Sequence, residues 1–149
     1  MVAVRPNADV TVGGWTNESG GSSLYPSLNE ASQSDATFIR SASDPANDVS
    51  EVHLDPTSIL ADGTVKIALG KGVNNAIAID TRVALVQGAT EIAAWNYANV
   101  AYGLVLKTET LTGPQLAAIT DFTDLRIRMR ANVGSGAGDF DSDFSNEFA

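Results

Sequence analysis

The sequence contains no cysteine, only one histidine and few aromatic residues, which make up 7% of its 149 residues. Without cysteine, the chain has no disulfide bonds, no thiolate nucleophile and no thiolate metal ligands. It also lacks a run of about 18 apolar residues and a positively charged, apolar leader, so we expect neither a membrane span nor a secretory signal. We therefore expect a soluble protein whose fold depends on its hydrophobic core.

Basic residues are scarce as well. The chain has 9 Lys and Arg against 18 Asp and Glu, which gives a net charge of −9. Proteins that bind nucleic-acid phosphates need clustered Lys and Arg, so this balance argues against a nucleic-acid partner. An acidic chain stays soluble at high local concentration, although many ordinary soluble domains are equally acidic.

No catalytic motif is present. The single histidine, His53, lies in "SEVHLDP" next to Asp55, where alternation places Val52 and Leu54 on one face of a strand and His53 on the other. We interpret His53 as an exposed strand residue rather than a catalytic base. The carboxylates are scattered and form no recognisable glycosidase pair. We predict no catalytic residues, no enzyme activity and no cofactor.

Two polar stretches are candidate ligand sites. "SDPANDVSE" carries Asp44 and Asp48 with oxygen ligands nearby, which suits calcium, but it lacks the spacing of an EF-hand and is interpreted as a solvated loop. The glycines of "GKGVNN" lack the Gly-Lys-Ser/Thr ending of a phosphate loop and are interpreted as turn residues. We predict no metal site.

The middle of the chain has the period-2 alternation of strands. Its inward positions are Val65, Ile67 and Leu69 in "TVKIAL" and Ile77, Ile79, Val83 and Leu85 in "AIAIDTRVALV". The short turn "QGAT" predicts a β-hairpin over 76–97, and "AYGLVLKTET" predicts another strand. One short helical turn is expected near 112–120, with Thr112 as N-cap and Pro114 in its first turn.

A closing hairpin is predicted at about 124–148. In "LRIRMRA", residues 125–131, apolar side chains alternate with arginines, and "DFDSDFSNEF" alternates apolar and acidic positions. One register brings opposite charges together on one face and apolar residues on the other. It pairs Ala131 with Phe140, Arg130 with Asp141, Arg128 with Asp143 and Ile127 with Phe144. A tail that docks as a helix in a partner's groove, disorder, and a phosphate-binding arginine stripe remain as alternatives.

The N-terminal third is rich in Gly, Ser, Asn and Pro with isolated aromatics. We expect residues 1–12 to form an extended arm that reaches a partner, and residues 13–149 to form a single domain. The residues predicted to contact a partner are Val2, Val4, Arg5, Pro6, Trp15, Tyr25, Phe144 and Phe148. For sugar binding, the candidate aromatics are Trp15, Tyr25, Trp95 and Tyr97, against the alternative that they pack in the sheets.

Four segments, in this order, resemble a family of small β-sandwich proteins encoded in the virion gene modules of tailed bacteriophages. They are "RPNADVTVGGWT", "LYPSLNEASQSDATFIRS", "TRVALVQGATEIAAWN" and "LTGPQLAAITDFTDLRIRMRA", and the resemblance spans about residues 5–131. The chain carries Phe38 where members have tyrosine, and Asn29 and Glu30 at the position of an acidic pair. The resemblance implies a jelly-roll-like, all-β antiparallel sandwich and a structural place in a phage particle.

Two functions follow from this resemblance. In the first, the protein decorates the capsid surface as a cement protein, with the major capsid protein as partner and self-association as a trimer; it would be made in the host cytoplasm. Added buried area would then stabilise the shell. In the alternative, the domain is a tail- or head-associated module that binds host glycans. A neck or tail structural role is a further alternative.

Overall fold

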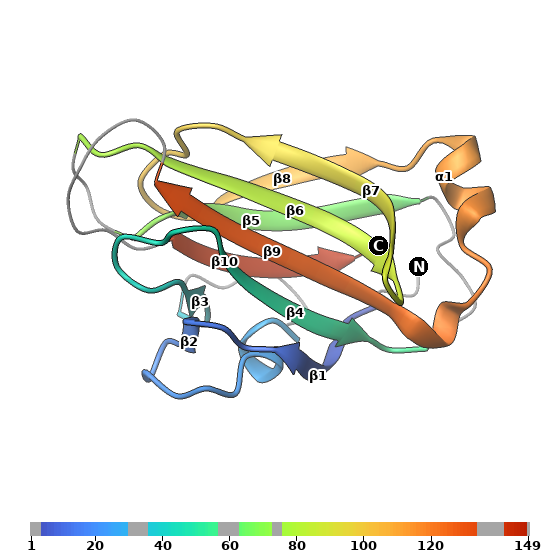
Figure 1. Cartoon of the computed structure of the whole chain (residues 1–149), viewed down its shortest axis with the longest axis horizontal. Coiled ribbons are helices and arrows are strands. Elements are labelled where there is room, and N and C mark those ends of the chain that lie inside the picture. The colour runs from blue at the N-terminus through green and yellow to red at the C-terminus, as the bar shows by residue number, and fades with distance from the viewer. Residues whose placement is uncertain (1–3, 30–35, 57–62, 73–75, 134–141, 149) are drawn as a thin grey trace.

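The computed structural model of the chain describes residues 4–29, 36–56, 63–72, 76–133 and 142–148, the last of these as backbone only. Within these ranges, ten strands form two five-stranded antiparallel sheets that face each other as a sandwich (Figure 1). The all-β, jelly-roll-like antiparallel sandwich predicted from the sequence is confirmed.

The chain passes repeatedly between the two sheets, so sheet neighbours are mostly distant in sequence. Sheet A has the order β1 (Pro6–Thr11), β4 (Asp48–Leu54), β9 (Leu125–Val133), β6 (Ile79–Gln87) and β7 (Thr90–Tyr97). Sheet B has the order β2 (Thr16–Asn17), β3 (Ile39–Arg40), β10 (Ser142–Phe148), β5 (Thr64–Lys71) and β8 (Val105–Thr110). The helical turns are η1 (Tyr25–Ser27), α1 (Gly113–Ala118) and η2 (Phe122–Asp124).

The core lies between the sheets and follows the alternation of the strands. Val83 and Leu85 of β6 and Ile127 of β9 are buried on the inner face of sheet A, as Ile67 and Leu69 are on that of β5. Each fully buried side chain of this size contributes about 1.5–3 kcal/mol by leaving water. The core positions predicted for these strands are confirmed, although Ile77 is only half-buried.

Two local predictions are also confirmed. β6 and β7 form a hairpin in which Gln87 pairs with Thr90, and Gly88 takes the positive φ of 57° that the tight turn requires. The helical turn α1 begins after Thr112, whose side chain accepts a hydrogen bond from the Gln115 amide while the Gln115 side chain accepts one from the Thr112 amide. No helix in the described ranges is long and apolar enough to span a bilayer.

The free N-terminal arm is wrong for the residues that the structure describes. β1 pairs with β4, with Asp9 opposite Val52, and Val4 and Pro6 are buried. Without β1, β4 would be an edge strand with a row of unpaired backbone groups. The pairing therefore makes this stretch part of sheet A, while Val2 lies outside the described residues.

The segment after β1 is fastened to the domain as well. The Asp9 carboxylate accepts hydrogen bonds from the backbone amides of Leu24, at 3.0 Å, and Tyr25, at 2.7 Å. The side chains of Trp15 and Leu24 are fully buried in the core, and Tyr25 is half-buried against it. Trp15 is therefore a core residue rather than a contact for a partner.

The closing hairpin is also wrong. β9 lies between β4 and β6 in sheet A, whereas β10 lies between β3 and β5 in sheet B. The strand interpretation of the C-terminal segment holds for Ser142–Phe148, but Phe144 is opposite Leu69 and Phe148 is opposite Val65. Phe140 and Asp141 lie outside the described residues. β9 and β10 each pair with other strands that have the same alternation of inward and outward residues. Alternation alone therefore could not select which strands are neighbours.

Trp15→Ala should lower the free energy of unfolding by about 3–5 kcal/mol, because it leaves a large cavity at a fully buried position. The matched change Val10→Ala, at a β1 side chain that is 43% exposed, should alter it by less than about 0.5 kcal/mol. Urea unfolding followed by circular dichroism measures both. Equal stability of the two variants would contradict a role for Trp15 in the core.

Candidate functional site

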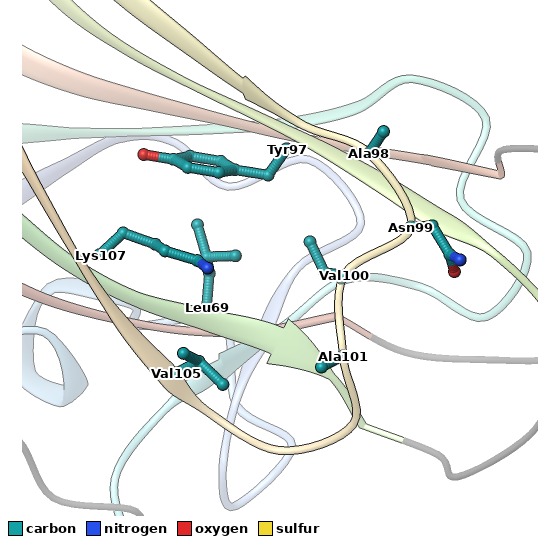
Figure 2. A pocket seen from close by; sticks show the side chains of 8 residues that line it. All are labelled: Leu69, Tyr97, Ala98, Asn99, Val100, Ala101, Val105 and Lys107. Carbon is teal, nitrogen blue, oxygen red and sulfur yellow. The ribbon is translucent and has the colours of Figure 1, made fainter.

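A pocket of about 420 Å³ lies at the edge of the sandwich formed by β7 and β8. These are the last strands of sheet A and sheet B, and the loop 98–104 carries the chain from one to the other (Figure 1). The pocket is lined by Leu69, Tyr97, Ala98, Asn99, Val100, Ala101, Val105 and Lys107 (Figure 2). Its wall is therefore mostly apolar with a few polar groups, which is the usual character of a small-molecule site.

Backbone hydrogen bonds hold the loop against sheet A. The Val100 amide donates to the Ile79 carbonyl at 2.9 Å, and the Asn99 amide donates to the Asp80 carboxylate at 2.8 Å. Val100 is buried, whereas Asn99 takes a positive φ of 46° and its side chain is exposed. In Figure 2 the Asn99 side chain points away from the ring of Tyr97.

The same loop is fastened to β5 in sheet B. The Lys71 amide donates to the Ala101 carbonyl at 2.8 Å, and the Gly103 amide donates to the Lys71 carbonyl at 3.1 Å. This close approach requires a glycine in β5, since a Cβ on Gly70 would lie 1.7 Å from the Gly103 carbonyl oxygen. The loop is thus held on both sides by backbone groups, which fixes the shape of the pocket.

Tyr97 connects the two sheets at the rim. Its hydroxyl donates a 2.8 Å hydrogen bond to Glu109 of β8, and the Lys107 ammonium lies 5.9 Å from the centre of its ring. Figure 2 shows the ring and the lysine side chain facing each other at one end of the pocket. Burial first, and then the hydrogen bond to Glu109, raise the pKa of the Tyr97 hydroxyl above its ordinary value of 10.0.

A smaller hollow of about 140 Å³ lies beside the pocket and shares Tyr97 and Ala98 with it. Asp80, Asn96 and Arg130 give it a polar lining. Arg130 is exposed and makes no ion pair with any residue that the structure describes. Its neighbours on the adjacent strands are Arg82 of β6 and Val49 of β4.

The other arginines on the outer face of sheet A form ion pairs with acidic side chains, but these acids are not the ones predicted from the sequence. Glu51 of β4 accepts hydrogen bonds from Arg126 at 3.1 Å and Arg128 at 2.8 Å. On β6 and β7, the 2.7 Å hydrogen bond from Arg82 lowers the pKa of Glu91. These pairs satisfy the guanidinium groups within the sheet and argue against a phosphate-binding stripe.

The remaining polar candidates have structural contacts. His53 is half-buried rather than exposed, with Nδ1 3.0 Å from the Leu54 carbonyl and Nε2 3.6 Å from Asp124. The Asp48 carboxylate accepts hydrogen bonds from the amides of Gly14 and Ala42 and so joins two loops. Among the described residues, no group of three or more His, Cys, Asp or Glu side chains is arranged to hold a metal ion.

The structure separates the residues predicted to bind a partner. Val4, Pro6 and Trp15 are buried, Arg5 and Tyr25 are half-buried at the β1 side of the sandwich, and Phe144 and Phe148 belong to an interior strand of sheet B. Of the aromatics proposed for sugar binding, Tyr97 lines the pocket, whereas Trp95 is half-buried against the core.

Sequence reasoning did not find Lys107, Asn99 or Val105. Alternation in "VLKTET" places Val105, Lys107 and Glu109 on one face of β8. Val105 and Lys107 pair with Leu69 and Ile67 of β5, whose side chains are buried in the core, so this face of β8 points inward. Charged residues on the inward-facing side of an edge strand indicate a polar rim at that edge of the sandwich. That signal becomes readable only once the neighbouring strand is known.

Comparison with known proteins gives a likeness of fold. No family model and no curated protein matches the chain. Among solved structures, SGBP-B from a complex xyloglucan utilization locus in Bacteroides uniformis matches with a TM-score of 0.57 and 12% identity over 94% of this chain. The chain spans 46% of that structure, so less than half of it is compared.

Two further structures match more weakly. One, titled "CBM4 structure and function", has a TM-score of 0.41 and 15% identity over 90% of this chain and 92% of its own. The other, the family 30 carbohydrate-binding module of the cellulosomal cellulase Cel9D-Cel44B of Clostridium thermocellum, has a TM-score of 0.38 and 12% identity over 99% and 96%. Their TM-scores are too low for these two structures to support an argument about the fold.

Tyr97→Phe should make stability less dependent on pH above the ordinary tyrosine pKa of 10.0. The folded pKa of Tyr97 is raised, so the unfolded chain loses this proton first and the wild type loses stability as the pH rises past 10.0. The difference between wild type and variant should change by at most about 1.4 kcal/mol per pH unit. Urea unfolding on both sides of that pH measures it, and parallel curves would contradict the buried hydroxyl.

Proposed function

We propose that the chain is a non-catalytic carbohydrate-binding module whose ligand occupies the pocket between β7 and β8. The observation that carries the proposal is the pocket itself: a preformed hollow with an aromatic wall at Tyr97, an apolar floor, and Lys107 and Asn99 at its rim. A sugar has apolar C–H faces and a periphery of hydroxyl groups, so it needs both kinds of lining.

Two further points support the proposal. The loop is fixed by backbone hydrogen bonds to both sheets, so binding does not have to order it, and that lowers the entropic cost of association. SGBP-B, part of which has the fold of this chain, comes from a xyloglucan utilization locus, and jelly-roll sandwiches occur among lectins. Together with the resemblance to virion proteins, these points favour a module on a phage particle that recognises host surface glycans.

Filling the pocket should abolish sugar binding without unfolding the domain. Ala101 is exposed and lines the pocket, so Ala101→Trp should weaken binding of a bound polysaccharide by at least about tenfold, or 1.4 kcal/mol. Affinity electrophoresis against a panel of bacterial surface polysaccharides, followed by calorimetry on any that bind, measures the effect.

The matched control is Ala117→Trp, which adds the same side chain at an exposed position of α1, outside the pocket lining. This variant should bind as the wild type does. The proposal fails if the wild type binds no polysaccharide of the panel, or if the two tryptophan variants bind equally well.

A second candidate function, capsid decoration, is favoured by an exposed apolar patch. Tyr102 is 58% exposed, and Leu106, on the outer face of the edge strand β8, is 43% exposed. Neighbouring exposed apolar residues mark surfaces that contact other proteins. In this proposal the patch, rather than an N-terminal arm, would contact the major capsid protein or a second copy in a trimer.

The number of copies per particle separates the two candidates. A decoration protein should be present at about one copy for each one to three capsid subunits, since it repeats with the shell lattice. Quantitative mass spectrometry of purified particles gives this ratio. A few copies per particle would rule out decoration and leave the glycan-binding module, and absence from the particle would rule out both virion locations.

A further inference from the structure

Lys107 is the cationic residue in the pocket lining, and its ammonium has no hydrogen-bond acceptor among the residues that the structure describes. It makes no hydrogen bond or ion pair with any residue that the structure describes, and it lies over the Tyr97 ring, 5.9 Å from the ring centre. By contrast, the Lys71 ammonium donates to the Ile77 carbonyl at 3.0 Å, and Arg82 donates to Glu91 at 2.7 Å.

The acid nearest to Lys107 along β8 does not pair with it. Glu109 shares its parity, but the Glu109 carboxylate accepts the hydrogen bond of the Tyr97 hydroxyl and lies beyond ion-pair distance of the lysine. Glu109 is also absent from the pocket lining, whereas Lys107 is part of it. The pocket therefore presents one positive charge and no lining carboxylate.

The surroundings of this charge are apolar. Leu69, Val100 and Val105 line the pocket with Lys107, and the lysine is only partly exposed to water. An ammonium group has three donors, and its partial removal from water costs free energy unless acceptors replace the lost hydration. A ligand that brings an anionic oxygen to this point would recover that cost through a charge-assisted hydrogen bond.

We infer that the ligand is an acidic sugar whose carboxylate binds the Lys107 ammonium, as a uronic acid would, while the sugar ring lies against Tyr97. The inference rests on the proposed carbohydrate-binding function and names its ligand class. The chain carries a net charge of −9, which repels an anionic polysaccharide at a distance. Preference for the acid therefore comes from this short-range contact rather than from the overall field.

The test compares acidic bacterial polysaccharides with their carboxyl-reduced forms, in which each uronic acid has become the corresponding neutral sugar. We expect the wild-type chain to bind a uronic-acid polysaccharide about 10- to 100-fold more tightly than its reduced form in calorimetry, the range for a hydrogen bond to a charged group. Because the change is made in the ligand, this comparison does not depend on the folding of any variant.

Protein variants test the same contact from the other side. Lys107→Met should weaken binding of the acidic form by about 10- to 100-fold and so remove the preference for it over the reduced form. Lys107→Arg should restore the preference. Lys66→Met changes the net charge equally at a lysine that is not part of the pocket lining, so it should bind as the wild type does.

Each outcome decides a different point. Equal binding of acidic and reduced forms, or equal behaviour of Lys107→Met and Lys66→Met, overturns the acidic-sugar inference. Binding of neutral polysaccharides alone also overturns it but leaves the proposed carbohydrate-binding function standing. If neither form of any polysaccharide binds, the proposed function and the inference both fall.

Discussion

The inner faces of the two sheets are apolar, and each can leave water only by covering the other. That constraint sets the positions of Ile67 and Leu69 on one side and Val83, Leu85 and Ile127 on the other. It also creates a difficulty where the sandwich ends, because the last strand of each sheet borders solvent. At the β7–β8 edge, the chain meets this difficulty with a crossing loop and a mixed polar and apolar rim, and the candidate site is made from those parts.

The rim illustrates how a structural requirement produces a binding surface. A phenol can lie half-buried with its ring against the core and its hydroxyl on a carboxylate, which Tyr97 does through Glu109. Lysine can likewise place its stem along apolar neighbours while its charged end reaches toward water. Once these side chains close the edge, their unburied parts face a shared hollow. Aromatic, apolar and charged surfaces then converge without any residue being taken from the core.

The sequence predicted which residues face inward but not which strands are neighbours. Alternation identified the buried faces of β5, β6 and β9, the 87–90 turn and the Thr112 cap, because each depends on residues close together in the chain. The supposed hairpin of β9 with the C-terminal strand failed, since Glu51 of β4 offers the arginines the same charge complement. Among the residues that line the pocket, Tyr97 was predicted from the sequence as a candidate sugar-binding aromatic. Lys107 could not be predicted, since its inward position follows from pairing with β5.

Gly70 has a consequence for how such a pocket can change. The loop above it is held by backbone amides and carbonyls, and the missing Cβ leaves room for that contact whatever side chains the loop carries. Ala98 and Ala101 both have exposed side chains on this fixed backbone. Their identities can therefore be exchanged while the frame is retained. A domain built in this way separates the part of its sequence that folds from the part that selects a ligand, and diversification can act on the second alone.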